Sequence, residues 1–439
     1  MRSPGLSGNG SSFIPAGERV GCRRRALFPL SGVSIFFSLF LFFSLLLQAA
    51  PAGAQLALES EPPRPSEPEP PRFHLTPALD VDYEYDDNIF FRTFNRESDF
   101  ITRVRPKFSF LVEQERVRWE ADVRADFAFY QEHSDLSTWN RAQSLDTRLT
   151  LRPSGIWTFE FFDTFLHSID PVEQLNLLLR RTEYFTNTVS LKGAYRFSPR
   201  LTLEAEVSNR VTQFKDPNFI DVDENEVRGA MTYLLTPLDK VTPEYRYRNF
   251  YFENRGNTEV HTGALKVEHR FTQTLTGRGM AGLLAIIDRG QEQNDILLGL
   301  GAEQRYSAVV VFTADFLRDV SVVGGLSGVF ITNTFSGSAI FHLTSWFDSI
   351  MGASWAFQQP LLSNRVNLDT IGVRVEEQVR LASWLRAVAS YSYRRQNLHG
   401  SPRDIYDNRV FIGLTALTTY PDAPGIDAAK TRSPHLEPR

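Results

Sequence analysis

The sequence predicts an all-β protein, a transmembrane up-and-down antiparallel β-barrel of about 18 strands, with 16 strands as the second choice. Three observations favour this class. Apolar and charged residues alternate along unusually long stretches, short and long polar connections alternate between those stretches, and the chain begins with a segment typical of secretion. Mean hydropathy is only -0.25. A barrel accommodates this value because only every second residue of a spanning strand faces lipid.

The clearest alternation lies between residues 100 and 131. Apolar residues occupy the even positions from Val104 to Val112, and after a polar break at 113–116 they occupy the odd positions from Val117 to Phe129. Charged residues fill most places between them. Successive side chains of a strand point to opposite faces, so the pattern predicts two strands of roughly a dozen residues each. That length exceeds the usual 5–6 or so residues and suits a tilted membrane-spanning strand, which needs about 9–11.

A two-residue turn at Gln114 and Glu115 would fix how these two strands pair. It would place Arg103 opposite Asp126 and Lys107 opposite Asp122, two favourable pairs. The same register would place Arg105 opposite Arg124, which needs an acid from a neighbouring strand.

Similar strands are expected from residue 75 to about Tyr420, although residues 296–320 read as either one strand or two. Their connections follow a regular order that is typical of barrels with short periplasmic turns and longer outer loops. Short turns are expected near residues 114, 154, 199, 237, 273, 307, 344 and 383, and longer segments near 88–99, 131–143, 168–183, 215–224, 253–257, 288–295, 319–327, 359–366 and 396–405.

An unpaired backbone amide in hydrocarbon costs several kcal/mol, so a spanning sheet must close and present one face to lipid and one to a lumen. We expect the charged face to line the lumen. The expected lumen-lining residues are Arg103, Arg105, Lys107, Glu120, Asp122, Arg124, Asp126, Arg148, Lys192, Arg196, Glu204, Glu206, Arg246 and Arg248.

Residues 1–54 have the features of a secretory signal peptide. Arg23 to Arg25 precede the apolar run from Ile35 to Leu47, and a small-residue site predicts cleavage between Ala54 and Gln55. An uncleaved helical anchor is the alternative. The expected organisation is signal peptide 1–54, Pro- and Glu-rich disordered periplasmic linker 55–73, outer-membrane barrel 74–420 and disordered tail 421–439.

Charge and motifs narrow the possible partners and sites. The chain has a net charge of -5, and its first 54 residues contribute five Arg and one Glu, or +4, which leaves -5 - 4 = -9 for the remainder. Such a charge disfavours nucleic-acid binding. The single cysteine, Cys22, lies in the segment expected to be removed.

Zinc spacing, phosphate-binding loops and dinucleotide fingerprints are absent from the sequence, so we assign no catalytic, cofactor or metal residues. One alternative is a calcium site formed by Asp86, Asp87 and Asn88 with Glu97 and Asp99. A second alternative is a calcium site in the acidic loop 216–224.

Two ends of the predicted barrel carry recognisable motifs. Residues 83–90 (YEYDDNIF) followed by 98–106 (SDFITRVRP) resemble the opening of the putative β-barrel porin-2 family of Gram-negative outer-membrane proteins, and residues 406–414 (YDNRVFIGL) resemble its last strand. The resemblance implies an outer-membrane location and a channel or export-associated role, since some members are encoded with exopolysaccharide systems. It implies no catalytic residues. The polar tail after Tyr420 departs from barrels that end on an aromatic residue.

Together these features predict a porin-like barrel that forms a polar channel for hydrophilic solutes, with a possible association with exopolysaccharide export. The expected partners are outer-membrane lipid and small polar solutes or polysaccharide, and the oligomeric state is left open. The alternatives are a plugged barrel acting as a structural protein or adhesin, a barrel hydrolase acting on lipid or glycan, and a secreted soluble β-sandwich or propeller.

Overall fold

The computed structural model describes residues 72–169, 181–253, 255–307, 309–361, 367–399 and 404–418. The predicted signal peptide, its cleavage site at Ala54 and Gln55, nearly all of the predicted linker, Tyr420 and the predicted tail lie outside these ranges. No helix among the described residues has the length and apolar character needed to cross a membrane.

Eighteen strands and one short 3-10 helix make up the described fold. The strands are β1 (Arg72–Asp86), β2 (Asp99–Glu113), β3 (Val117–Tyr130), β4 (Thr138–Ser154), β5 (Trp157–Ser168), β6 (Tyr184–Ser198), β7 (Leu201–Phe214), β8 (Val222–Leu234), β9 (Asp239–Phe252), β10 (Gly256–Arg270), β11 (Leu275–Asp288), β12 (Gln291–Arg305), β13 (Val310–Val322), β14 (Val329–His342), β15 (Phe347–Pro360), β16 (Leu368–Ala382), β17 (Leu385–Leu398) and β18 (Ile405–Leu417). The helix η1 (Ser134–Leu136) lies between β3 and β4.

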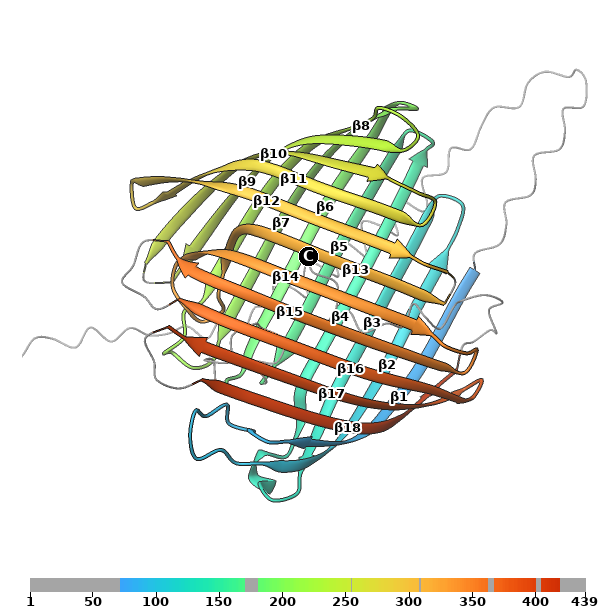
Figure 1. Ribbon diagram of the computed structural model, residues 1–439, viewed down its shortest axis with the longest axis vertical. Coiled ribbons are helices and arrows are strands. Elements are labelled where there is room, and N and C mark those ends of the chain that lie inside the picture. Colours follow the sequence, from blue (N-terminus) through green and yellow to red (C-terminus); the bar gives the residue numbers. More distant parts are fainter. Residues whose placement is uncertain are drawn as a thin grey trace, which may run out of the picture. The chain divides into compact units, whose positions relative to one another are not determined.

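Each strand pairs antiparallel with its neighbours in the chain, and β1 also pairs with β18. Figure 1 shows this seam, with β1 in blue beside β18 in red. The sheet therefore closes on itself, which is the arrangement that removes free edges. The predicted fold class and the count of 18 strands are confirmed.

The seam joins the two motifs that carried the family resemblance. Tyr83 lies opposite Ile412, Tyr85 opposite Val410 and Asp86 opposite Arg409. These motifs are more than 300 residues apart in the chain, so closure of the barrel depends on their meeting.

Two boundaries differ from those expected from the sequence, and one open alternative is resolved. The first strand begins at Arg72, inside the predicted linker 55–73, because its first residues pair with the end of β2. The region 296–320 forms parts of two strands, β12 and β13. The predicted long connection 288–295 is wrong: Arg289 and Gly290 alone connect β11 to β12, both with positive φ, which is typical of a tight hairpin turn.

The register predicted for β2 and β3 is also wrong. Lys107 lies opposite Arg124 rather than Asp122, and Asp122 lies opposite Ser109. The physical reason is the turn: three residues, 114–116, separate the two strands, and the Gln114 N–H donates to the Val117 carbonyl at 2.8 Å. A longer turn shifts every opposing pair, because turn length sets hairpin register.

The outer surface is apolar over much of its area. Trp119, Leu191, Leu203, Ile412 and Leu414 are each at least 40% exposed, and the first three alternate with half-buried polar residues. Large apolar side chains so exposed on a closed barrel favour contact with hydrocarbon, as in transmembrane barrels of outer membranes.

Candidate channel interior

The inner face is identified by an ion pair that crosses the barrel. Arg248 on β9 lies 2.7 Å from Asp319 on β13, although β10, β11 and β12 lie between these strands in the sheet. Two side chains can meet over three intervening strands only on the concave side. The face that carries Arg248 is therefore the interior of the barrel.

The register places the fourteen residues expected to line the lumen on this same face. Arg246 on β9 lies opposite Arg228 on β8, and Arg228 lies opposite Glu206 on β7. Glu206 in turn lies opposite Lys192 on β6. Residues directly opposite each other on neighbouring strands share a face of the sheet. On the earlier strands, Arg148 of β4 lies opposite Glu120 of β3. The complete set is Arg103, Arg105, Lys107, Glu120, Asp122, Arg124, Asp126, Arg148, Lys192, Arg196, Glu204, Glu206, Arg246 and Arg248.

The first group of interior charges centres on Glu84 of β1. Its carboxylate lies 2.7 Å from Arg103, 3.5 Å from Arg409 and 3.9 Å from Arg141. The Glu84 side chain is only 2% exposed. Arg103 also pairs with Asp126, which is a diagonal contact and not the directly opposed pair expected from the sequence.

The neighbouring strand β1 supplies the acid that Arg105 requires. Asp82 pairs with Arg105 at 2.5 Å. Lys107 reaches Asp122 at 3.5 Å as a diagonal pair, so the predicted charge match survives although the predicted register does not.

A second group of interior charges centres on Glu244 of β9. Lys266 lies 2.8 Å and Arg228 2.9 Å from its carboxylate. Arg228 also approaches Glu206 at 3.4 Å, and Lys192 approaches Glu204 at 3.3 Å. Every acid of this second group thus has a partner of opposite sign within 3.4 Å.

Seven of these residues were not among the predicted site residues: Glu84, Arg141, Arg228, Glu244, Lys266, Asp319 and Arg409. The signal that could have found most of them is the same alternation, because they occupy the polar positions of their strands. Their mutual contacts depend on neighbours from distant parts of the chain.

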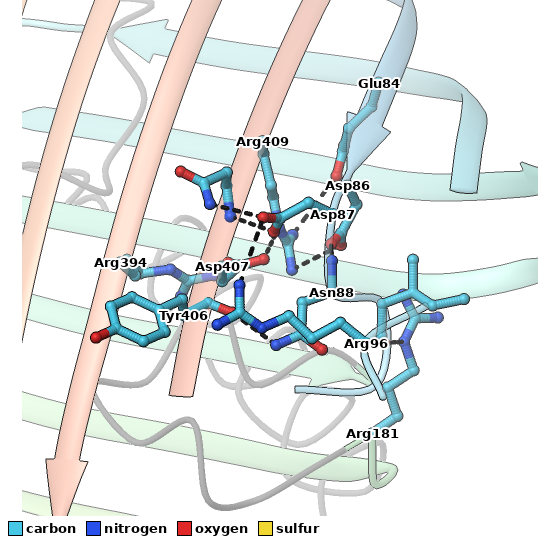
Figure 2. A network of polar contacts seen from close by, with 12 residues as sticks. Glu84, Asp86, Asp87, Asn88, Arg96, Arg181, Arg394, Tyr406, Asp407 and Arg409 are labelled. Carbon is cyan, nitrogen blue, oxygen red and sulfur yellow. Dashed lines mark hydrogen bonds and ion pairs between the residues drawn. The ribbon is translucent and has the colours of Figure 1, made fainter. Parts of the chain in front are cut away.

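The acidic cluster at the seam corresponds only in part to the predicted calcium alternative. Asp86, Asp87 and Asp407 each place one oxygen atom within 4.8 Å of the others. Figure 2 shows that Arg409 extends to this cluster, 3.2 Å from both Asp86 and Asp407. Asp87 accepts two hydrogen bonds from Asn408, each 2.7 Å long. The Arg409 guanidinium and the Asn408 donors thus offset part of the negative charge of the cluster.

Glu97 and Asp99, the other members of that alternative, face the connection between β3 and β4. Asp99 accepts backbone N–H bonds from Phe100, Glu132 and His133. His133 lies between two carboxylates, with Nδ1 3.0 Å from Asp99 and Nε2 3.0 Å from Glu97. Hydrogen bonding to Asp99, together with Glu97, raises the pKa of His133 above its ordinary value.

The connection between β1 and β2, the first outer loop (residues 87–98), packs against the inner wall. Ile89 is fully buried beside Ile101, Ala128 and Tyr130. Asn88 holds the loop by donating to the Tyr406 carbonyl at 2.6 Å and to the Arg92 carbonyl at 2.9 Å. The loop therefore occupies part of the interior.

Comparisons with known proteins found similarities in sequence and in structure. Residues 72–153 match the family model described as Putative beta-barrel porin 2. Two solved outer-membrane structures from Pseudomonas aeruginosa are similar: OccK1 (OpdK), at 11% identity over 79% of this chain and 99% of that chain with a TM-score of 0.45, and OccK2 (OpdF) in complex with glucuronate, at 10% identity over 79% and 98% with a TM-score of 0.45.

A protein of Vibrio vulnificus named polyamine aminopropyltransferase is 30% identical over 158 residues, which is 36% of this chain and 48% of that protein. The chain thus spans about half the length of this curated relative. The resemblance predicted from the opening strands is confirmed over residues 72–153, where the family model aligns.

Proposed function

We propose that the barrel is an outer-membrane channel for small hydrophilic solutes. The observation that carries the proposal is the interior wall, where paired acids and bases on β1 to β10 face a lumen while large apolar side chains face outward. Barrels of 16–18 strands enclose an aqueous path. In this proposal the fourteen residues predicted from the sequence line that path.

The mixed sign of the wall guides the choice of solute. Arg228 and Lys266 surround Glu244, and similar pairs recur along the wall. Neighbouring charges of opposite sign can orient polar groups of a neutral or zwitterionic solute without a strong preference for cations or anions. A sugar-like solute fits such a wall. As a finer part of the proposal, the barrel serves a polysaccharide export system, and loss of secreted polysaccharide in cells lacking the chain would support it.

The proposal includes export through a cleaved signal peptide. Removal of residues 1–54 would leave Gln55 as the first residue on the periplasmic side, followed by the linker. Mass spectrometry of the protein isolated from outer membranes tests this step. A mature chain that retains Arg23 to Arg25 would contradict it.

A plugged barrel with a structural or adhesive role is the second candidate. Two segments that fold inward favour this candidate. One is the first outer loop, and the other is the tip of the β13–β14 hairpin (residues 319–331, the hairpin tip), whose Asp319 pairs with Arg248 on β9. Both narrow the interior from the outer end. The two candidates differ in whether water and ions pass through the barrel.

Planar-bilayer conductance of the purified barrel distinguishes these candidates. A channel gives stable conductance steps, and Lys192→Glu shifts the reversal potential in a salt gradient toward cation preference, because it replaces a wall cation with an anion. The neighbouring outward residue Leu191 offers the matched control Leu191→Gln, which should leave ion preference unchanged. Absence of conductance steps would favour the plugged barrel.

We propose no reaction for this chain. Incubation of the purified barrel with lipid and glycan substrates tests the hydrolase alternative. Turnover that disappears on substitution of a single Ser or His would favour that alternative over the channel.

A further inference from the structure

The pairing between β12 and β13 ends halfway up the wall. The two strands are joined from Arg305 opposite Val311 to Leu298 opposite Arg318. β12 continues to Gln291, yet among the described strands residues 291–297 pair with β11 alone. The barrel wall is therefore split above Leu298 on the outer side.

Side chains bind polar groups at the two edges of this split. The Ile296 N–H donates to the Asp295 carboxylate at 2.7 Å, and the Val320 N–H donates to the Asp319 carboxylate at 2.7 Å. Arg318 joins the edges by donating to both Asp295 oxygens at 2.8 Å. One backbone N–H on each edge is thus bound by the side chain that precedes it, and Arg318 bridges the two edges.

The hairpin tip leaves the wall at the split and lies across the interior. Asp319 pairs with Arg248, whose guanidinium also donates to the Val320 carbonyl at 2.8 Å. Farther along the tip, Ile220 forms an isolated bridge with Gly325, and the Ser327 carbonyl accepts from Arg255 at 2.9 Å. Gly325 and Gly328 have φ values of 75° and 96°, which only glycine adopts readily.

The inner wall beneath the tip is apolar, unlike the charged wall elsewhere. Side chains of five consecutive strands and of the tip form one cluster of buried residues there. Its members are Val222, Phe250, Phe252, Val260, Leu284, Ile286, Leu297, Val320, Val329 and Ile331. Leu297 belongs to the free edge of β12, so this apolar site borders the split directly.

If Arg305 marks the periplasmic edge of the apolar band, strand geometry places the start of the split in the outer lipid leaflet. A strand rises about 3.3 Å per residue and tilts about 40°, so each residue gains about 2.5 Å of height. The paired part of β12 and β13 thus rises about 20 Å, whereas the apolar band of such barrels is about 25 Å tall. Outward-facing Ile296, which is 53% exposed, flanks the split just above its lower end.

We propose that the split between β12 and β13 is a lateral passage for an amphiphile with a hydrocarbon chain, moving between the lumen and the outer leaflet. The chain takes the apolar site that Val320, Val329 and Ile331 occupy in this closed state. The apolar part of this exchange costs little transfer free energy, because one apolar contact replaces another. The contacts of the tip with Arg248 and Arg255 must break at the same time. The polar headgroup remains among the interior charges.

Photo-crosslinking with a diazirine-bearing hexadecanoate tests the passage. The probe is added to the full barrel in lipid bilayers, and labelled residues are mapped by mass spectrometry. We expect labels on inward-facing Leu284 and Leu297 in addition to outward-facing residues. Labels confined to outward-facing side chains would overturn the proposal.

Two neighbouring leucines provide a matched pair of variants. Leu284 is 1% exposed and faces inward, whereas Leu283 is 71% exposed and faces outward. Leu284→Asn should lower labelling of the remaining inner cluster about tenfold, the factor for about 1.4 kcal/mol, and Leu283→Asn should not. Equal labelling in both variants would count against an apolar chain site.

A second pair of variants keeps the proposal testable if Leu284→Asn fails to fold. Arg318→Ala removes the contact across the split and should raise inner labelling about two- to fivefold, the range for a partly exposed ion pair. Arg278→Ala removes an ion pair with Asp315 at a height where the strands are fully joined, and should have no effect. An unchanged Arg318→Ala variant would contradict the passage. Conductance measured on the same samples reports the polar channel separately.

Discussion

Replacement of Glu84 by Gln tests whether the interior charges hold the seam of the barrel together. The Glu84 carboxylate has three arginines within 3.9 Å, and the Glu84 and Arg141 side chains are both 2% exposed. Removal of one partner from a buried ionic group leaves uncompensated charge and typically costs about 3–5 kcal/mol. Glu84→Gln keeps the shape of the side chain, so the loss reports mainly on charge.

Urea unfolding of the barrel in lipid vesicles, followed by tryptophan fluorescence, measures this loss as a change in the free energy of unfolding. Glu120→Gln is the matched control. Its partner is Arg118, and both of these side chains are more than a third exposed, so their pair contributes under about 1 kcal/mol. If Glu84→Gln were no more destabilising than Glu120→Gln, the network would not be a source of stability.

Three further predictions follow from turns and loops. The β2–β3 register predicts that cysteines replacing Ser109 and Asp122 form a disulfide in higher yield than cysteines replacing Lys107 and Asp122, because Ser109 and Asp122 lie directly opposite each other. A higher yield from the second pair would instead support the register expected from the sequence. For pH, the raised pKa of His133 means that its contribution is fully present below the unfolded pKa of about 6.5 and is lost as pH rises through the folded pKa. Hydrogen exchange in the first outer loop should therefore increase with pH beyond the intrinsic rate, and His133→Gln should abolish that dependence; a dependence retained in the variant would exclude this contact as its source. For the hairpin tip, Gly328→Ala should destabilise the barrel by more than about 1 kcal/mol, because φ is 96°, a backbone conformation that L side chains rarely adopt; urea unfolding equal to that of the wild type would refute this account.

The candidate site was predictable in part. The alternation of charged and apolar residues selects the polar face of each strand, and the fourteen selected residues do share one face. The same pattern underestimates the network, because Glu84 and Glu244 gain their arginine and lysine partners from other strands. Their importance appears only once those strands are adjacent.

The sequence by itself determined the class of the fold, the number of strands and the division into two faces. These properties follow from a two-residue period and from turn residues, both of which act over a few neighbouring positions. The β2–β3 register required the tertiary structure, because one extra turn residue moves every opposing pair. Tertiary structure also decided the seam between β1 and β18, the inward hairpin tip and the split beside it. Each of these depends on contacts between residues distant in the chain, and a local pattern cannot specify which distant partner a strand or loop will meet.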